Sequence, residues 1–108
     1  METDATSAWT ALGDPTRRAI FERLAERPRA VGELAALVPV SRPAVSQHLK
    51  VLKLAGLVGD RPAGKQRIYH TEQDGLAALR ADLDRFWNTT LAAYKTVVEQ
   101  PSKEIEPT

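Results

Sequence analysis

Apolar residues recur at helical spacing through the first half of the chain and again after residue 73. Before residue 40 the pattern predicts three helices, over residues 7–12, 15–26 and 31–37. Asp14 followed by Pro15 marks the start of the second helix, because an aspartate cap and a proline at the first position are typical of a helix N-terminus. Pro28 and Pro39 follow the second and third helices, which proline cannot continue.

A fourth helix is expected to begin after Ser41, whose hydroxyl can cap it, with Pro43 tolerated in its first turn. Gly56 can end this helix in a left-handed conformation. The inward stripe of the helix has spacings of four and three residues and consists of Val45, Leu49 and Leu52. A short helix, a tight connection at residues 39–41 and a capped helix together predict a helix-turn-helix motif.

The period then changes to that of two short strands, over residues 57–61 and 66–71, with a turn at residues 62–65. Helical spacing returns over residues 73–99. This order predicts a mainly α fold with a small β-hairpin, a winged helix-turn-helix (α-α-α-α-β-β-α). Its 108 residues fit a single domain, with residues 1–6 and 101–108 expected to be frayed tails.

Charge is distributed unevenly along a chain whose net charge is only +1. Between residues 41 and 70 six side chains are basic and only Asp60 is acidic, whereas the segments on both sides are net negative. Such a segment could face a polyanion, although a solvated basic surface accounts for the imbalance equally well.

The outward face of the fourth helix favours nucleic acid, because it combines polar and basic residues with no acid from Ser41 to Gly59. Arg42 can pair with guanine or phosphate, and Gln47 can pair with adenine. A hairpin with basic residues is unremarkable alone, but directly after such a helix it is expected to act as a wing. The predicted DNA-binding residues are Arg42, Pro43, Ser46, Gln47, Lys50 and Lys53 on the helix and Arg61, Lys65 and Arg67 in the wing.

The last helix carries an apolar stripe of about 23 residues, or roughly 34 Å, which is longer than so small a domain can cover. Pairing with a second chain would bury the stripe; the alternative is a monomer whose first helix covers it. A dimer through the first and last helices would present two fourth helices about 34 Å apart to an inverted repeat. The predicted interface residues are Trp9, Leu12, Leu83, Phe86, Trp87, Leu91 and Tyr94.

Several kinds of site are disfavoured by the residues available. The sequence has no cysteine, which excludes disulfides, zinc–thiolate sites and cysteine catalysis. His48 and His70 lack the partners of a metal site, and no cluster of titratable residues suggests an enzyme. These absences lead us to expect no metal or other cofactor. Neither a signal peptide nor a membrane span is evident, so we expect a cytoplasmic protein.

Residues 41–52, Ser-Arg-Pro-Ala-Val-Ser-Gln-His-Leu-Lys-Val-Leu, closely resemble the recognition-helix signature of ArsR-type winged-helix regulators. Residues 14–18, 55–58 and 64–69 are also similar to that family, and the resemblance covers roughly residues 8–98. It implies a homodimer joined by the first and last helices that usually acts as a repressor. Many relatives bind metals or arsenicals through cysteines on the third helix, which this sequence lacks, so it resembles a metal-independent branch.

These observations predict a sequence-specific, double-stranded DNA-binding transcriptional repressor that binds an inverted repeat as a homodimer, with its own operon as one candidate target. An alternative is a protein-interaction module that uses the winged-helix scaffold without specific DNA binding. Acids on the outer face of the fourth helix would have favoured that alternative. The sequence does not indicate whether a small molecule controls DNA binding, or which one.

Overall fold

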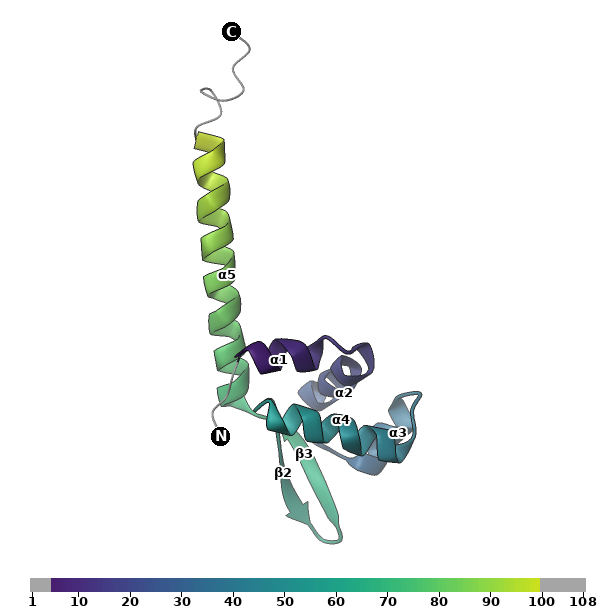
Figure 1. The fold of residues 1–108 in the computed structure, drawn as a ribbon. Coiled ribbons are helices and arrows are strands. Elements are labelled where there is room, and N and C mark those ends of the chain that lie inside the picture. Colours follow the sequence, from purple (N-terminus) through teal and green to yellow (C-terminus); the bar gives the residue numbers. More distant parts are fainter. Residues whose placement is uncertain (1–4, 100–108) are drawn as a thin grey trace.

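The computed structural model describes residues 5–99, which form helices and short strands around one hydrophobic core (Figure 1). The elements in chain order are α1 (Ala5–Leu12), α2 (Pro15–Glu26), β1 (Arg29–Ala30), α3 (Val31–Leu37), α4 (Arg42–Leu54), β2 (Val58–Ala63), β3 (Gln66–Thr71) and α5 (Gln73–Glu99). The predicted winged helix-turn-helix order is therefore confirmed, with β1 added. Of the expected tails, residues 1–4 and 101–108 lie outside the described residues. Residues 5 and 6 were wrongly assigned to a tail, because α1 already begins at Ala5.

The predicted caps explain where α2 and α4 begin. Asp14 Oδ1 accepts a hydrogen bond from the Arg17 backbone N–H at 2.9 Å, and Pro15 is the first residue of α2. That hydrogen bond is the main reason why the pKa of Asp14 lies below its ordinary value. Ser41 Oγ accepts from the Ala44 backbone N–H at 3.3 Å and so caps α4. Gly56 follows α4 with a φ of 80°, the left-handed conformation expected of a glycine there.

The sheet has three strands in the order β1-β3-β2, all antiparallel. Strand β1 was not predicted, because two residues after Pro28 are too few to show an alternating pattern. It adds to β3 through the pairs Arg29↔Tyr69 and Ala30↔Ile68 and thereby connects the end of α2 to the base of the hairpin.

The hairpin turn is tighter than the expected four residues. Strand pairing continues through Pro62↔Arg67 and Ala63↔Gln66, which leaves only Gly64 and Lys65 in the turn. Pro62 is tolerated in β2 because β2 is an edge strand, where a missing N–H breaks no ladder on its outer side. Gly64 has a φ of 65°, which a two-residue turn commonly requires.

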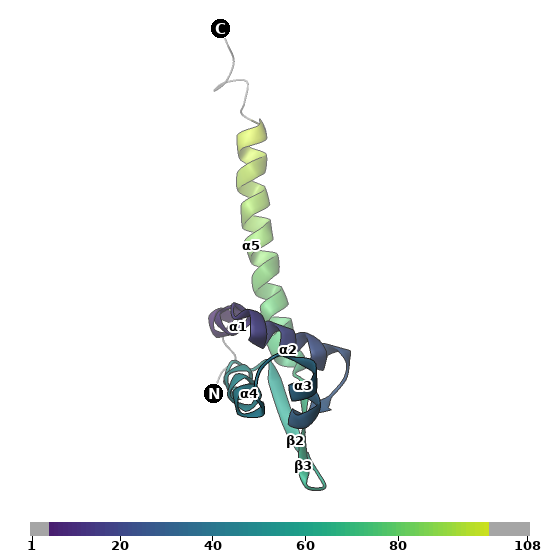
Figure 2. The same cartoon turned by 90° about the vertical axis from the view of Figure 1, so that its right-hand side faces the viewer.

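The core joins α1, α2, α3, α4 and the base of the hairpin. Its largest fully buried side chains are Ile20, Leu34, Val45, Leu49, Leu52, Leu57 and Val58. The inward stripe predicted for α4 is confirmed, because all three of its members belong to this core. The hairpin and α5 leave this body in opposite directions, as two views show (Figures 1 and 2).

Candidate nucleic-acid interface

Helix α4 places every residue of its predicted DNA-binding face in solvent. All six of its predicted contact residues have exposed side chains, whereas the apolar stripe on the other side of the helix is buried. The six are Arg42, Pro43, Ser46, Gln47, Lys50 and Lys53. Among the described residues, the side chains of Arg42, Gln47 and Lys50 have no hydrogen-bonding or ion-pair partner. Their donors and acceptors are therefore available to an incoming ligand.

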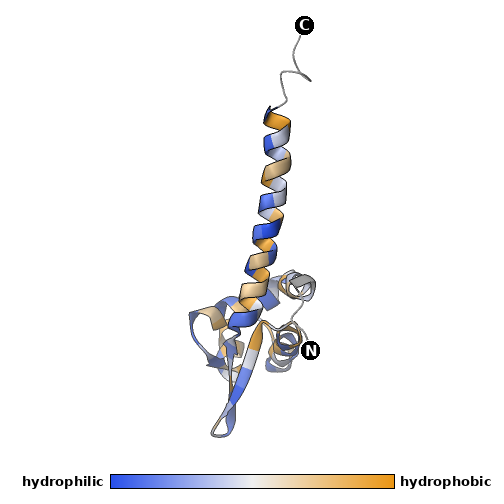
Figure 3. Cartoon of the chain, turned by 90° about the vertical axis from the view of Figure 1, so that its left-hand side faces the viewer, coloured by the Kyte–Doolittle hydropathy of each residue, from blue (hydrophilic) through white to orange (hydrophobic). Residues whose placement is uncertain are grey.

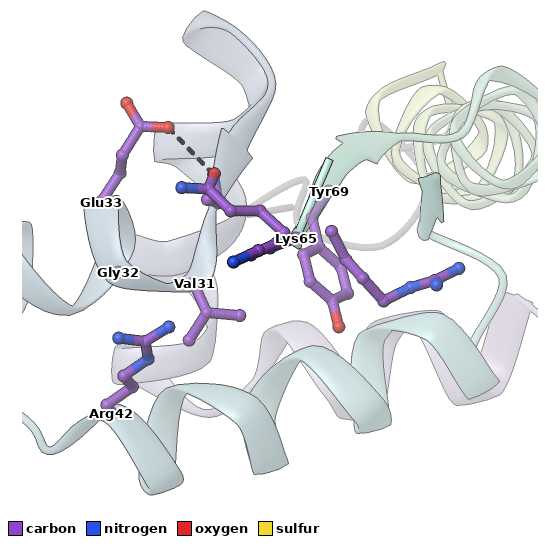
Figure 4. Close-up of a pocket in the computed structure, with 9 residues that line it drawn as sticks. Val31, Gly32, Glu33, Arg42, Lys65 and Tyr69 are labelled. Carbon is purple, nitrogen blue, oxygen red and sulfur yellow. Dashed lines mark hydrogen bonds between the residues drawn. The ribbon is translucent and has the colours of Figure 1, made fainter. Parts of the chain in front are cut away.

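A cleft of about 470 Å³ separates the N-terminal ends of α3 and α4 from the hairpin (Figure 4). Arg42 lies on its helical side, with Nη1 3.7 Å from the position that a Cβ of Gly32 would occupy. Lys65 and Arg67 come from the hairpin side. The cleft therefore carries cations on both walls, and Glu33, its one acid, is engaged by the Ala30 backbone N–H and by Arg27. These two bonds, the Ala30 bond first, hold the pKa of Glu33 below its ordinary value.

Tyr69 also lines this cleft and was missed by the sequence interpretation. Side chains alternate between the faces of a strand, so Tyr69 shares a face of β3 with Arg67. That spacing of two from a predicted wing residue could have identified it. Its hydroxyl has no hydrogen-bonding partner among residues 5–99.

Asp60, the one acid in the basic segment, holds two of the predicted DNA-binding residues. Its Oδ1 lies 2.7 Å from Lys53 Nζ and its Oδ2 accepts from Arg67 Nε at 2.6 Å. The hydrogen bonds from Lys53 and then Arg67 lower the pKa of Asp60, and the carboxylate in turn raises the pKa of Arg67. The sequence identifies Asp60 as the only acid of this segment, but it does not predict that Asp60 lies between the two cations.

The predicted dimer residues lie along α1 and α5. Trp9 Nε1 donates to Asp82 Oδ2 at 2.6 Å, which connects the two helices within one chain. Leu12 is half-buried against the chain's own core. The remaining interface candidates are exposed, at 41% for Trp9, 38% for Leu83, 59% for Phe86, 50% for Trp87, 54% for Leu91 and 67% for Tyr94. Helix α1 therefore does not cover the stripe, whose apolar bands are visible along α5 (Figure 3).

Two other properties of the described residues concern ligands and membranes. No group of three or more His, Asp or Glu side chains within residues 5–99 is placed to hold a metal ion. Over the same residues, no helix is long and apolar enough to cross a membrane.

A helix-turn-helix domain family matches residues 12–59, the segment from the end of α1 to the start of β2. The chain is 65% identical over 92 residues to the HTH-type transcriptional regulator Rv2034 of Mycobacterium tuberculosis, covering 85% of this chain and 86% of that protein. It is 42% identical over 72 residues to the HTH-type transcriptional repressor SmtB of the same species. That match covers 67% of this chain and spans only 53% of the repressor.

Solved structures agree with the fold. An ArsR-like transcriptional regulator from Rhodococcus sp. RHA1 superposes with a TM-score of 0.72 at 32% identity, covering 86% of this chain and 91% of that one. The homodimeric winged helix-turn-helix DNA-binding domain of Mb0332 from Mycobacterium bovis superposes with a TM-score of 0.63 at 28% identity, covering 80% of each chain. The chain thus belongs to the ArsR family of winged helix-turn-helix proteins, which are DNA-binding transcriptional regulators and not enzymes.

Proposed function

We propose that the protein is a sequence-specific repressor that binds an inverted repeat in double-stranded DNA as a homodimer. The observation that carries this proposal is the exposed, acid-free outer face of α4, on which the side chains of Arg42, Gln47 and Lys50 have no partner among the described residues. A helix of this kind fits the major groove, where its N-terminal residues reach base edges. Repression is favoured by the similarity to SmtB, which is named as a repressor.

The residues of α4 divide by the chemistry that they offer to DNA. Gln47 offers the bidentate amide that suits adenine, while Arg42 suits guanine or a phosphate. Ser46 can bond to either, Pro43 offers an apolar contact, and Lys50 neutralises phosphate. Base readout is thus assigned to the first two turns of the helix.

The cleft between α4 and the wing suits the sugar-phosphate strand beside the major groove. Lys65 and Arg42 supply cations from its two walls, and the Tyr69 hydroxyl supplies a neutral donor. Arg61 is exposed on the outer part of the hairpin and suits the adjacent backbone or minor groove. Lys53 and Arg67 form ion pairs with Asp60, so they are the weaker candidates for phosphate contact.

The second chain is proposed to cover the exposed stripe of α5. Leu91 and Tyr94 lie beyond the reach of α1 and are more than half exposed, an arrangement that is costly for a monomer. The similar Mb0332 domain is homodimeric. Two-fold pairing through α1 and α5 would present two α4 helices to successive major grooves, about 34 Å apart.

The control signal is proposed to be something other than a thiolate-bound metal, because the sequence contains no cysteine to supply such ligands. The proposed branch of the family is therefore a metal-independent one, in which another signal, or none, controls how much of the DNA site is bound. A regulator of this kind acts where the chromosome is, and we propose a cytoplasmic location.

Fluorescence anisotropy with labelled DNA from upstream of the gene tests the DNA contacts. Gln47→Ala is expected to bind the preferred site about 5–150-fold more weakly while binding unrelated DNA normally, because one bidentate base contact is worth about 1–3 kcal/mol. Lys65→Ala is expected to weaken binding to all sequences alike and to reduce the salt slope by about 1. Equal losses on all sequences for both variants would contradict the assignment of base readout to Gln47.

A further inference from the structure

Asp60 stands out because an acid beside a phosphate-binding surface opposes the function of that surface. It is the only acid from Ser41 to Thr71, and it lies in the first half of the wing. Repulsion from phosphate would weaken binding unless the carboxylate were neutralised. In this structure it forms two ion pairs, one with Lys53 and one with Arg67.

The position of Asp60 explains how it reaches both cations. Asp60 pairs with Tyr69 across β2 and β3, so its side chain lies on the same face as Tyr69 and diagonally opposite Arg67. Lys53 reaches the same carboxylate from the last turn of α4. Three elements that present DNA-binding side chains thus meet at one carboxylate.

Burial is also unequal across this cluster. The Asp60 side chain is 7% exposed, whereas those of Lys53 and Arg67 are 53% and 54% exposed. The carboxylate is therefore nearly enclosed, whereas about half of each cationic side chain faces solvent. Arg67 uses Nε toward Asp60, and its Nη atoms make no other hydrogen bond among the described residues.

We propose that Asp60 is a positioning residue that sets DNA specificity, by fixing the wing to the C-terminal end of α4 and by withholding the charge of Lys53 and Arg67 from phosphate. This proposal rests on the proposed DNA contacts of α4 and the wing. Two cations held in this way cannot swing to an arbitrary phosphate, so non-specific binding is kept weak. A wing held at one angle accepts only DNA whose backbone follows the correct path.

Asp60→Asn tests the proposal, because asparagine keeps the shape of the side chain and removes its charge. One carboxylate offsets one positive charge, so its loss should make the slope of log K against log salt on random DNA steeper by about 0.9. Lowering salt from about 200 to about 50 mM should then increase non-specific affinity about 3–4-fold more than in the parent protein. The ratio of specific to non-specific affinity at about 50 mM salt should fall, because the freed cations can bind any phosphate.

Asp84→Asn is the matched control, since Asp84 is an exposed acid on α5 whose loss changes the net charge by the same amount. It should leave the salt slope unchanged. If Asp60→Asn behaves like Asp84→Asn, or if specific and non-specific affinity fall together at an unchanged slope, the proposal is wrong. If the parent protein binds no DNA, the proposed function itself has failed.

A second comparison remains decisive if Asp60→Asn does not fold. Lys50 and Lys53 are exposed lysines three residues apart on α4, but only Lys53 is held by Asp60. Lys50→Gln should reduce the salt slope by about 0.9, and Lys53→Gln should reduce it by clearly less, because Lys53 is already paired with Asp60. Equal reductions would show that Asp60 does not withhold charge and would overturn the proposal.

Discussion

The first turn of α5 lies directly against the backbone of Gly56, two residues after the end of α4: a Cβ atom added to Gly75 would collide with the Gly56 carbonyl group, 2.7 Å from its carbon. Gly75 is buried, and Gly56 holds the left-handed conformation that turns the chain toward β2. The helix proposed to join two chains is therefore in direct contact with the end of the helix proposed to read DNA.

Gly75→Ala is expected to destabilise the fold by about 1–3 kcal/mol, because the added methyl group must displace either α5 or the turn after α4. Gly32→Ala is the matched control, since its Cβ would meet Arg42 at an ordinary 3.7 Å. In that case the change from glycine should be neutral or stabilising, by up to about 1 kcal/mol. Urea unfolding of both variants measures the difference, and equal stabilities would contradict the close approach of Gly75 to Gly56.

The dimer through α5 is tested by placing a charge on its exposed stripe. Leu91→Glu should give a monomer that remains folded, because Leu91 is 54% exposed within one chain and supports no core contact there. Ala92→Glu introduces the same charge about 100° around the helix, away from the stripe, and should remain dimeric. Light scattering gives the mass of each variant, with circular dichroism as the check on folding. A parent protein that is monomeric at micromolar concentration would contradict the interface.

Tyr69→Phe removes only the hydroxyl that faces the cleft. We expect binding to weaken about 2–10-fold on every sequence, the value of one hydrogen bond of about 0.5–1.5 kcal/mol, without a change in salt slope. Thr89→Val, which removes a hydroxyl from exposed α5, should have no effect. A shift in base preference on Tyr69→Phe would show that the cleft does not hold the backbone.

Stability should depend on pH through Asp14. Because its pKa is lower in the folded protein, Asp14 stabilises the fold above its unfolded pKa of about 3.9, and this contribution is lost as the pH falls through the folded value. The difference in Tm between the parent and Asp14→Ala should therefore shrink as the pH falls below about 4. A difference that does not shrink in that range would contradict the role of Asp14 as a charged cap.

Much of the helical fold could be predicted from the sequence because its signals are local. Asp14 and Ser41 make the hydrogen bonds that their positions predicted, and Gly56 has the expected left-handed φ. Strand β1 could not be predicted, because it exists only through pairing with a strand about 40 residues away. The same limit applies to function: exposure on α4 follows from helical periodicity, but the ion pairs of Asp60 depend on how the hairpin lies against α4.

Hydroxyl-radical footprinting of the DNA upstream of the gene tests whether two α4 helices read successive major grooves of one operator. We expect two protected half-sites of inverted sequence, with centres about 10 base pairs or a multiple of that apart, and we expect this protection to disappear as salt is raised. Protection without sequence preference, or none at low salt, would contradict this expectation.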